Sequence, residues 1–361
     1  AEGGGAAAGP AWPGFRALSV TRIVRETGQV CSIYLAADDG AALPAAKPGQ
    51  YLTLRVSGAG QPAPVRSYSL SSPPGDSTYR ISVKQEPHGA ASSYLDGSLK
   101  PGEKLDVAAP RGDFVLDDGD GPVLLISAGI GATPVLAMLH QLTAARSQRE
   151  VWWLYGARGP REHPFATEAH DLLAGLPHAT AHVFYSAATP AERRAAHATA
   201  GRLTRDALGG LDLPASANAY ICGPASFMAD MSHALTAIGL GRAAIHTELF
   251  GALPAVRPGI TGQVARSPHQ PPGPAESGPG VTFARSGIAT PFGDQWHNVL
   301  DLADACDVPT RWSCRTGVCH TCVTPLLSGN ISYEPDPLEL PADGQVLICC
   351  ARPATDIVLD L

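Results

Sequence analysis

The 361-residue sequence lacks any apolar run near the roughly 20 residues that a membrane-spanning helix needs. It also lacks a signal-peptide pattern and a basic stripe, so neither a membrane nor a nucleic acid is indicated as a partner. Charged residues make up only 16% of the chain, a fraction that fits a soluble globular protein. This length is too great for a single core and predicts two or three domains.

Cysteine is scarce outside the C-terminal segment. Only Cys31 and Cys222 precede residue 281, which disfavours a disulfide framework. Cys31 and Cys306 fall on apolar stretches, which predicts core positions for both. The chain opens with AEGGGAAAGP and no Met, from which we expect either processing or a fragment of a longer polypeptide.

Four cysteines near the C-terminus carry the most specific signal. Cys314, Cys319 and Cys322 stand as Cys-x4-Cys-x2-Cys, and Cys349 follows 27 positions later. This is the plant-type spacing for a 2Fe–2S cluster, in which four thiolates bind two irons. Three sulfurs must surround one small inorganic core, and Gly317 inside the loop lets backbone N–H groups approach. The oxygen-sensitive cluster and the missing signal sequence together predict a cytoplasmic protein.

Other kinds of metal site fit this cysteine pattern less well. A structural zinc site is disfavoured because zinc sites usually carry Cys-x2-Cys pairs. A Rieske centre needs two His in place of two Cys, so His320 is expected only to line the loop. Cys350 competes with Cys349 as the fourth ligand. Similar ferredoxins place Pro four residues after the ligand, as Pro353 stands here, which favours Cys349, and strand alternation would turn Cys350 away.

The net charge of −7 is unevenly distributed. Residues 281–361 hold ten acidic residues, four Arg and no Lys, a balance of −6, which leaves about −1 for the rest of the chain. Such asymmetry favours docking to a basic partner surface, although a merely solvated acidic face is an equal alternative. Asp301 and Asp304, on a predicted helix before the cluster loop, are candidates for steering.

The pattern of short runs predicts a multidomain protein. Residues 1–14 form a flexible tail, and six β-rich runs in residues 15–117 predict an antiparallel β-barrel. In residues 118–250, strands alternate with helices, as in a doubly wound α/β domain with a parallel sheet. Residues 251–280 hold seven Pro and six Gly and predict a linker. Residues 281–361 predict a small α+β domain that carries the cluster loop.

The run Arg66-Ser67-Tyr68-Ser69 falls on the fourth predicted barrel strand. Arginine can pair with a phosphate, an aromatic ring can cover a flat ring system, and a hydroxyl can bond its edge. Further along, Gly89–Ser92 opens a short predicted helix whose N-terminal N–H groups suit a pyrophosphate. These features together suit a ligand that carries phosphates and a flat ring system.

The motifs R-x-Y-S, I-S-V-K, G-x-x-S and P-x-G-D-F together resemble the flavin domain of the ferredoxin–NADP reductase superfamily, most closely the reductase half of flavohaemoglobins. SAGIGATP (127–134) resembles that family's nicotinamide-nucleotide loop, although Pro134 replaces the last Gly of G-x-G-x-x-G; proline is sound at a helix start. YICGP (220–224) and HTELFG (246–251) resemble its second strand end and its flavin-covering segment. The resemblance covers residues 15–250.

The order of flavin, nucleotide and C-terminal ferredoxin (β-grasp) domains resembles phthalate dioxygenase reductase-like proteins. No globin segment is present, so a flavohaemoglobin's dioxygenase activity does not carry over. The resemblance implies that Ser69, Cys222 and Glu248 lie beside the site of hydride transfer. There they position the reacting groups and do not react themselves. It implies cofactor contacts at Tyr51, Arg66, Ser67, Tyr68, Ser69, Ser82, Val83, Lys84, Gly89, Ala91, Ser92, Gly129, Ile130, Gly131, Ala132, Thr133, Pro134, Arg158, Cys222, Gly223, Pro224 and Phe250.

The cofactors expected are FAD, a 2Fe–2S cluster and NADH or NADPH. Tyr51 and the LFG segment favour FAD, while FMN stays open because dioxygenase reductases of this domain order use it. Arg158 and Arg161 could meet a 2′-phosphate, but similar arginines occur in NADH-using relatives.

A nicotinamide delivers two electrons as hydride and a 2Fe–2S cluster accepts one at a time, so a flavin is needed between them. The leading hypothesis is a monomeric NAD(P)H-dependent reductase that feeds a separate oxygenase, either a Rieske-type or a haem-thiolate enzyme. One alternative is the reductase end of a longer fused polypeptide, and another is a redox-sensing iron–sulfur flavoprotein. Turnover of NAD(P)H with an artificial acceptor would separate the enzymes from the sensor.

Overall fold

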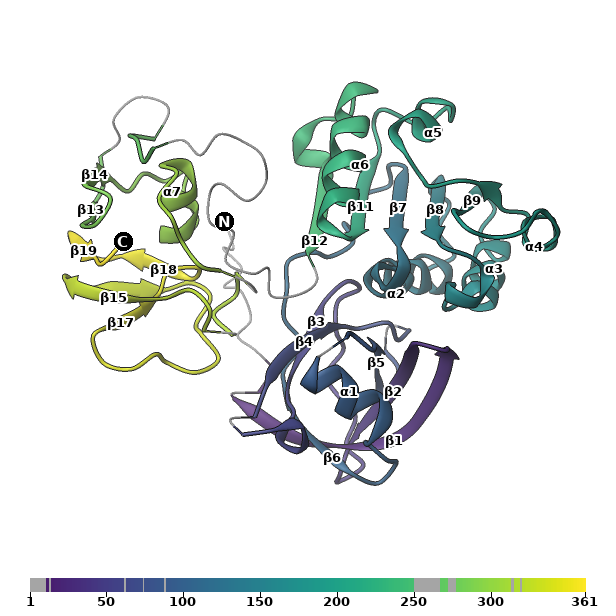
Figure 1. The fold of residues 1–361 in the computed structure, drawn as a ribbon, viewed down its shortest axis with the longest axis horizontal. Coiled ribbons are helices and arrows are strands. Elements are labelled where there is room, and N and C mark those ends of the chain that lie inside the picture. Colours follow the sequence, from purple (N-terminus) through teal and green to yellow (C-terminus); the bar gives the residue numbers. More distant parts are fainter. Residues whose placement is uncertain are drawn as a thin grey trace, which may run out of the picture. The chain divides into compact units, whose positions relative to one another are not determined.

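The computed structural model describes residues 11–12, 14–61, 63–73, 75–87, 89–249, 267–271, 277–312, 315–318 and 320–361. The chain divides into two compact units, Ala1–Phe250 and Gly251–Leu361. Each is described by itself below (Figure 1). In the part of the chain that the structure describes, no helix is both long and apolar enough to cross a membrane.

The first half of the larger unit is an antiparallel six-stranded sheet with the order β4-β3-β6-β1-β2-β5. Its strands are β1 (Phe15–Thr27), β2 (Val30–Ala37), β3 (Tyr51–Arg55), β4 (Val65–Ser69), β5 (Tyr79–Lys84) and β6 (Lys104–Ala108). A bridge between Leu70 and Ile81 joins the two edges, so the sheet closes into the predicted barrel. Helix α1 (Ala90–Gly97) places Leu95 in the barrel core, and η1 (Ser57–Ala59) is a single turn.

Trp12 lies in the stretch that the sequence predicted to be a tail. Its side chain is buried, stacks on Tyr79, and donates its indole N–H to the carbonyl oxygen of Val107 at 3.1 Å. Trp12 therefore packs as part of the barrel core rather than with the residues before it.

The second half of this unit is a parallel sheet with the order β10-β9-β8-β7-β11-β12. Its strands are β7 (Val123–Ala128), β8 (Val151–Ala157), β9 (Ala179–Tyr185), β10 (Thr199–Ala200), β11 (Asn218–Gly223) and β12 (Ile245–Leu249). Its helices are α2 (Ala132–Ala144), α3 (Ala166–Ala174), α4 (Pro190–Ala195), α5 (Arg205–Gly209) and α6 (Ala225–Ala237), with short turns η2 (Gly129–Gly131), η3 (Pro160–Glu162) and η4 (Arg242–Ala244).

Two cores lie on opposite faces of this sheet. Leu125 packs with residues of α2 and α3, while Leu124 and Ile126 pack with residues of α5 and α6. Burial on both faces explains why β7 reads as a continuous apolar run without alternation. The chain leaves β7 for β8 on one side and returns as β11 on the other, so a crevice is expected outside the carboxyl ends of these strands.

The smaller unit is an α+β fold. A sheet of order β14-β13-β19-β15-β17 contains β13 (Gly280–Phe283), β14 (Ile288–Pro291), β15 (Val323–Ser328), β17 (Gln345–Leu347) and β19 (Ile357–Leu359), and β16 (Ile331–Tyr333) pairs with β18 (Ala351–Pro353). Helix α7 (Val299–Ala305) buries Leu300 and Leu302 in the core. His269, in the predicted linker, donates its backbone N–H to the carbonyl oxygen of Cys306 at 2.9 Å, so this part of the linker packs on the unit.

Candidate functional site

The turn between β7 and α2 is shaped to receive a phosphate. Gly129 has a φ of +57°, and a Cβ on Gly131 would lie 2.3 Å from the carbonyl oxygen of Cys222, so both positions require glycine. Tyr155 donates its hydroxyl to the carbonyl oxygen of Gly129 at 3.2 Å. The turn leads directly into α2, whose first residue is Ala132. Unpaired N–H groups at such a helix start suit an anion.

A cleft of about 1200 Å³ lies at the carboxyl ends of β7, β8 and β11. This volume is ample for a dinucleotide, since ligand pockets typically enclose about 300–1,000 Å³. Predicted residues that line it are Lys84, Gly129, Ile130, Arg158 and Pro224. Arg202, Arg205 and Phe227 also line it and were missed, because no motif marks them in the sequence.

The remaining residues of the nucleotide motif hold the loop in place rather than line the cleft. Ala132, Thr133 and Pro134 are buried in the first turn of α2, and Thr133 donates its hydroxyl to the carbonyl oxygen of Ile130 at 3.1 Å. Gly223, at the end of β11, lies against the ring of Phe227. These residues hold the shape of the loop, which explains their place in the motif.

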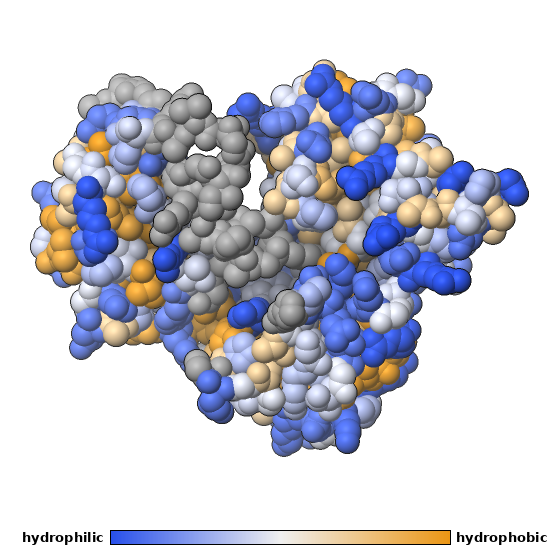
Figure 2. Space-filling view, in the orientation of Figure 1, coloured by the Kyte–Doolittle hydropathy of each residue, from blue (hydrophilic) through white to orange (hydrophobic). Residues whose placement is uncertain are grey.

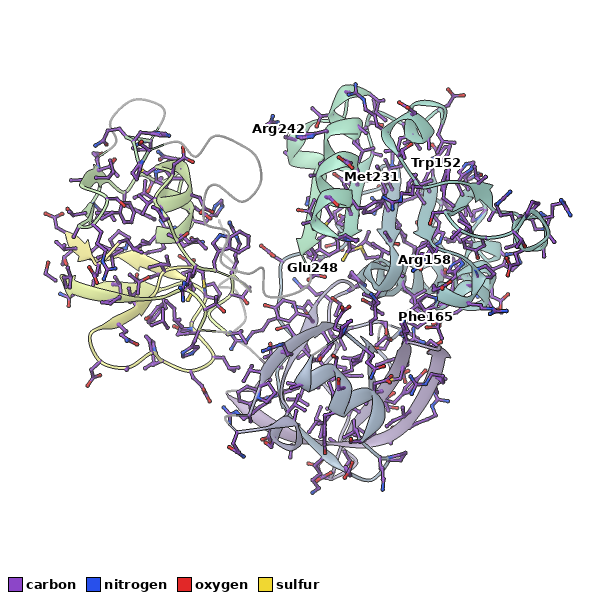
Figure 3. All side chains as sticks on the ribbon, viewed as in Figure 1. Trp152, Arg158, Phe165, Met231, Arg242 and Glu248 are labelled. Carbon is purple, nitrogen blue, oxygen red and sulfur yellow. The ribbon has the colours of Figure 1, made fainter. Side chains whose placement is uncertain are left out.

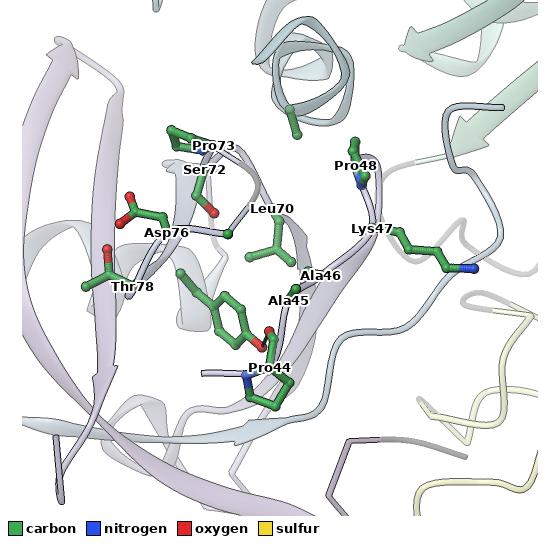
Figure 4. A pocket seen from close by; sticks show the side chains of 13 residues that line it. Pro44, Ala45, Ala46, Lys47, Pro48, Leu70, Ser72, Pro73, Asp76 and Thr78 are labelled. Atoms are coloured by element: carbon green, nitrogen blue, oxygen red, sulfur yellow. Dashed lines mark hydrogen bonds between the residues drawn. The ribbon is translucent and has the colours of Figure 1, made fainter. Parts of the chain in front are cut away.

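A second cavity in this unit, beside Tyr79 and Pro44, is far smaller (Figure 4). It encloses about 20 Å³, which is room for little more than one water molecule. Of the two, only the large cleft can hold a nucleotide.

The structure brings together the three residues predicted beside hydride transfer. Ser69, at the end of β4, donates its hydroxyl to Glu248 Oε2 on β12 at 3.0 Å. Cys222 is the register partner of Glu248 on the neighbouring strand β11 and is fully buried. Figure 3 shows Glu248 at the edge of the parallel sheet that faces the barrel. Ser69 and Glu248 therefore join the barrel to the nucleotide half at one point.

The pKa of the Glu248 carboxyl group is unusually high. Burial raises its pKa to about 8, the charge of Asp113 adds to this, and the hydrogen bond from Ser69 opposes it. Burial and the nearby Glu248 likewise raise the pKa of the Cys222 thiol well above its ordinary value. Both groups are thus largely neutral at pH 7, so neither adds a negative charge beside Ser69 there.

We expect the rate of flavin reduction by NAD(P)H to fall as pH rises through about 8, because Glu248 then becomes negative where a hydride must arrive. Glu248→Gln, which keeps a neutral side chain, should flatten the profile between pH 6 and 9. Stopped-flow measurement of flavin bleaching in both proteins tests this. Identical pH profiles in both would show that Glu248 does not set the dependence.

The residues of the predicted flavin strand are arranged along one end of the barrel. Arg66 and Ser67 are exposed on β4, and Ser67 shares a hydrogen bond with Thr53 at 3.0 Å. Tyr68 is half-buried, and burial raises its pKa to about 12, so it stays a neutral phenol. Tyr51 is paired in register with Ser69 across β3 and β4. An exposed guanidinium next to an aromatic ring fits a flavin nucleotide.

The side chains of two predicted flavin residues, Ser82 and Val83, are buried inside the barrel. The Ser82 hydroxyl lies in a buried row, 2.9 Å from Ser32 and 3.0 Å from Ser71. Val83 is fully buried in the barrel core. At these two positions only the backbone is therefore available to a flavin, whereas Lys84 of the same motif lines the large cleft.

The turn that opens α1 is held by Ser92. Its hydroxyl donates to the carbonyl oxygen of Gly89 at 3.1 Å and accepts the backbone N–H of Glu86 at 3.1 Å. Ala91 is buried beside it. Ser92 thus shapes the helix start, while the predicted flavin contact at Phe250 lies outside the described residues.

An ion pair between a buried arginine and a half-buried glutamate joins the barrel to the nucleotide half. Arg80 on β5 donates to both carboxylate oxygens of Glu168 on α3, at 2.9 and 2.7 Å, and to the carbonyl oxygen of Ser71. His140 on α2 lies 2.6 Å from the same carboxylate. Burial opposes ionisation of Glu168, but the hydrogen bonds from His140 and Arg80 outweigh it and lower its pKa to about 2. No sequence motif signalled this contact.

The cluster loop of the smaller unit is described in part. Cys314 and Cys319 lie outside the described residues, whereas Cys322 and Cys349 are buried. Gly317, with a φ of +69°, donates its backbone N–H to Cys349 Sγ at 3.4 Å. A backbone N–H directed at this sulfur fits a thiolate ligand.

The thiols of Cys349 and Cys350 point to different partners, but for another reason than the one predicted from the sequence. Cys349 and Cys350 lie in a turn between β17 and β18, so the prediction that strand alternation separates them is wrong. Cys350 instead points its thiol at the carbonyl oxygen of Leu347, 3.6 Å away. His320 lies 3.0 Å from the carbonyl oxygen of Glu339 and lines the loop.

Asp301 and Asp304 were candidates for steering a partner. Both are paired with Arg315, at 3.5 and 2.6 Å, and the Arg315 guanidinium lies over the Trp312 ring. One guanidinium thus compensates part of the charge of the two carboxylates, which weakens the case for a steering role of these two residues.

Comparisons with known proteins identify three cofactor-binding families in this chain. Residues 32–116 match the family described as Oxidoreductase FAD-binding domain, 125–233 the Oxidoreductase NAD-binding domain, and 281–354 the 2Fe-2S iron-sulfur cluster binding domain. The flavohemoprotein of Deinococcus radiodurans is 41% identical over 253 residues, which cover 70% of this chain and 63% of that protein. The flavohemoprotein of Chromobacterium violaceum is 39% identical, covering 67% and 62%. The chain thus spans less than two thirds of either relative.

Solved structures resemble the chain in two ways. The FAD/NAD-binding domain of nitric oxide dioxygenase from Vibrio cholerae is 34% identical, with a TM-score of 0.60, and covers 66% of this chain and 99% of that one. Phthalate dioxygenase reductase is 23% identical, with a TM-score of 0.57, but covers 96% of this chain and 98% of that one, which shows the same fold throughout.

The chain therefore belongs to the FAD- and NAD-binding oxidoreductases of the ferredoxin–NADP reductase superfamily. Within that superfamily its first 250 residues are of the flavohemoprotein reductase type, and they are followed by a 2Fe–2S domain. The predicted domain order, FAD and the 2Fe–2S cluster are confirmed by these matches.

Proposed function

We propose that the chain is an NAD(P)H-dependent reductase that passes electrons through FAD and a 2Fe–2S cluster to an oxygenase. One observation carries the proposal: the hydrogen bond between Ser69 and Glu248 joins the FAD-binding barrel to the parallel sheet of the nucleotide half, beside Cys222. Two cofactor sites that meet at one polar contact suit direct transfer between their ligands. When bound, FAD would accept a hydride from the nicotinamide, and the cluster would relay electrons one at a time.

The chain's own side chains hold and orient the groups. Arg66 and the start of α1 would bind FAD phosphates, and Tyr68 would cover the flavin ring. The turn Gly129–Gly131 would bind the nucleotide phosphates. Cys314, Cys319, Cys322 and Cys349 would bind the cluster. Hydride transfer needs no acid or base, so Ser69, Cys222 and Glu248 act by positioning and by keeping the site neutral.

The oxygenase partner and a cytoplasmic, monomeric state belong to the same proposal. The support is the likeness in fold to phthalate dioxygenase reductase, a modular structure for electron transfer from pyridine nucleotides to a 2Fe–2S cluster. A second candidate is the reductase end of a longer chain. An intact type IV self-sufficient cytochrome P450 monooxygenase shares this fold over 96% of our chain and 41% of its own, with 23% identity and a TM-score of 0.60. Copurification of a separate oxygenase would favour the first candidate.

Removal of residues from Gly251 onward should leave a flavoprotein that still oxidises NAD(P)H with ferricyanide. The first unit is compact by itself, so it is expected to keep its FAD. Cytochrome c reduction should fall by about tenfold or more, because a one-electron relay has been lost. Steady-state assays with both acceptors test this. An insoluble or flavin-free product would show that the two units depend on each other.

A further inference from the structure

Three polar aromatic side chains are buried in the nucleotide half. Figure 2 shows strongly hydrophilic side chains on the surface of this half, around β9 and α4. Tyr155 on β8, His163 directly after η3 and Tyr185 on β9 are instead buried. No sequence motif marks them, and hydride transfer uses none of them. Because buried polar groups need hydrogen-bond partners, the partners of these three indicate their role.

The three side chains form one connected chain of contacts. The ring of His163 stacks on that of Tyr155, with the ring centroids 4.2 Å apart and an angle of 18° between the ring planes. His163 Nδ1 shares a hydrogen bond with the Tyr185 hydroxyl at 2.8 Å, and these two rings meet edge to face. Trp153, two residues earlier on β8, packs beside the Tyr155 ring at 6.5 Å. These neighbours leave the Tyr155 ring little freedom to turn.

This chain of contacts is uncharged near neutral pH. Burial lowers the pKa of His163 to about 4, so its imidazole is neutral. Burial also raises the pKa of the Tyr155 hydroxyl far above its ordinary value, so the hydroxyl keeps its proton. Tyr155 is therefore a fixed hydrogen-bond donor, and its acceptor is the carbonyl oxygen of Gly129 at 3.2 Å.

The Gly129 carbonyl belongs to the same peptide group as the backbone N–H of Ile130. In a planar trans peptide these two groups point in opposite directions. Since the oxygen is directed at buried Tyr155, the N–H is directed the other way, and Ile130 lines the large cleft. As one of the first residues of the turn Gly129–Gly131, Ile130 has an N–H that the hydrogen bonds of the turn do not use.

Gly129 needs an external restraint. Its φ is +57°, and no atom of the described residues outside the turn lies within 4 Å of the position that a Cβ would occupy there. Packing therefore does not hold this residue, and glycine has the greatest backbone freedom of all residues. Its carbonyl oxygen also accepts the backbone N–H of Ala132, at the start of α2. The Tyr155 hydroxyl adds a bond from the sheet.

We propose that Tyr155 is a positioning residue for the dinucleotide: its hydroxyl orients the Gly129–Ile130 peptide so that the Ile130 N–H faces the pyrophosphate. His163 and Tyr185 hold the Tyr155 ring for this purpose. A hydrogen bond to the carbonyl also polarises the peptide group and strengthens its N–H as a donor. The inference rests on the proposed reductase function. It applies equally to NADH and NADPH, because both carry the pyrophosphate.

The first test is steady-state kinetics of the full-length holoprotein with ferricyanide as the acceptor. Tyr155→Phe removes the hydroxyl and keeps the ring. We expect KM to rise about three- to tenfold, by the same factor for NADH and NADPH, with kcat nearly unchanged, which is the effect of one lost hydrogen bond. Tyr79→Phe is the matched control, because Tyr79 is also buried and donates its hydroxyl to a backbone carbonyl oxygen, that of Pro44 in the barrel. It should keep the wild-type KM.

The second test asks whether His163 acts through Tyr155. His163→Phe keeps a flat ring beside Tyr155 but loses the bond to Tyr185, so it should raise KM in the same direction by a smaller factor. In the double variant with Tyr155→Phe, the His163 change should raise KM no further, because the hydroxyl that it positions is absent. Additive effects of the two changes would show that His163 does not act through the Tyr155 hydroxyl.

The third test needs no turnover. ADP-ribose carries the pyrophosphate but no nicotinamide, and calorimetry should show that Tyr155→Phe weakens its binding by the same factor by which KM rises. Unchanged affinity for ADP-ribose in this variant would overturn the positioning role while leaving the reductase function intact. Failure of the wild-type protein to oxidise either dinucleotide would overturn the reductase function itself.

Discussion

Cys349→Ser is expected to abolish the 2Fe–2S cluster. Cys349 is buried, receives the backbone N–H of Gly317, and supplies one of four thiolates that the cluster requires. Iron content should drop to about a tenth or less of the wild-type value, and cytochrome c reduction should fall by about 100-fold. Ferricyanide reduction directly from the flavin should be preserved, because the FAD and nucleotide sites lie in the other unit.

Cys350→Ser is the matched control, since Cys350 is the next residue and equally buried but turns its thiol to the Leu347 carbonyl oxygen. It should keep its iron and its electron paramagnetic resonance signal. Cys350→Ala guards against the cost of a buried hydroxyl. Loss of iron in both Cys350 variants, together with normal iron in Cys349→Ser, would mean that Cys350 is the ligand.

Glu168→Gln is expected to destabilise the FAD- and nucleotide-binding unit by about 3 kcal/mol. Arg80 is almost completely buried, so removing its carboxylate partner leaves an uncompensated charge between the barrel and α3. The matched control is Asp171→Asn, which removes an exposed carboxylate from the same helix. Urea unfolding monitored by flavin fluorescence gives the free energy of unfolding for each protein.

The effect should depend on pH in one direction. The Glu168 carboxyl has a pKa of about 2 in the folded chain, below its ordinary value of 4.5. Its contribution to stability is therefore complete above pH 4.5 and is lost as pH falls towards 2. Wild type and Glu168→Gln should differ most near neutral pH and converge in acid. A difference that stays constant down to pH 2 would show that the ion pair is not its source.

The sequence predicted those features that depend on residues close together in the chain. The apolar run of β7 predicted a strand buried on both faces, and the spacing of Cys314, Cys319 and Cys322 predicted the cluster domain that the comparisons confirm. Ser69 and Glu248 are 179 residues apart, and only the resemblance to a known family brought them together before the structure did.

Contacts between distant segments without a motif could not be predicted. Arg80 and Glu168 are 88 residues apart, and neither stands in a pattern that requires a partner. Arg202 and Arg205 belong to the cleft only because β10 pairs beside β9 at the edge of the sheet. The turn at Cys349 and Cys350 was misjudged because apolar residues around it read equally well as a strand.

The most direct test of the account is an anaerobic titration of the full-length protein with NADPH, followed by visible absorption and electron paramagnetic resonance. The account predicts one FAD and one 2Fe–2S cluster per chain, bleaching of the flavin, and then the rhombic signal of a reduced cluster without any added mediator. Zinc in place of iron would contradict it. So would a cluster that dithionite reduces but NADPH and NADH do not.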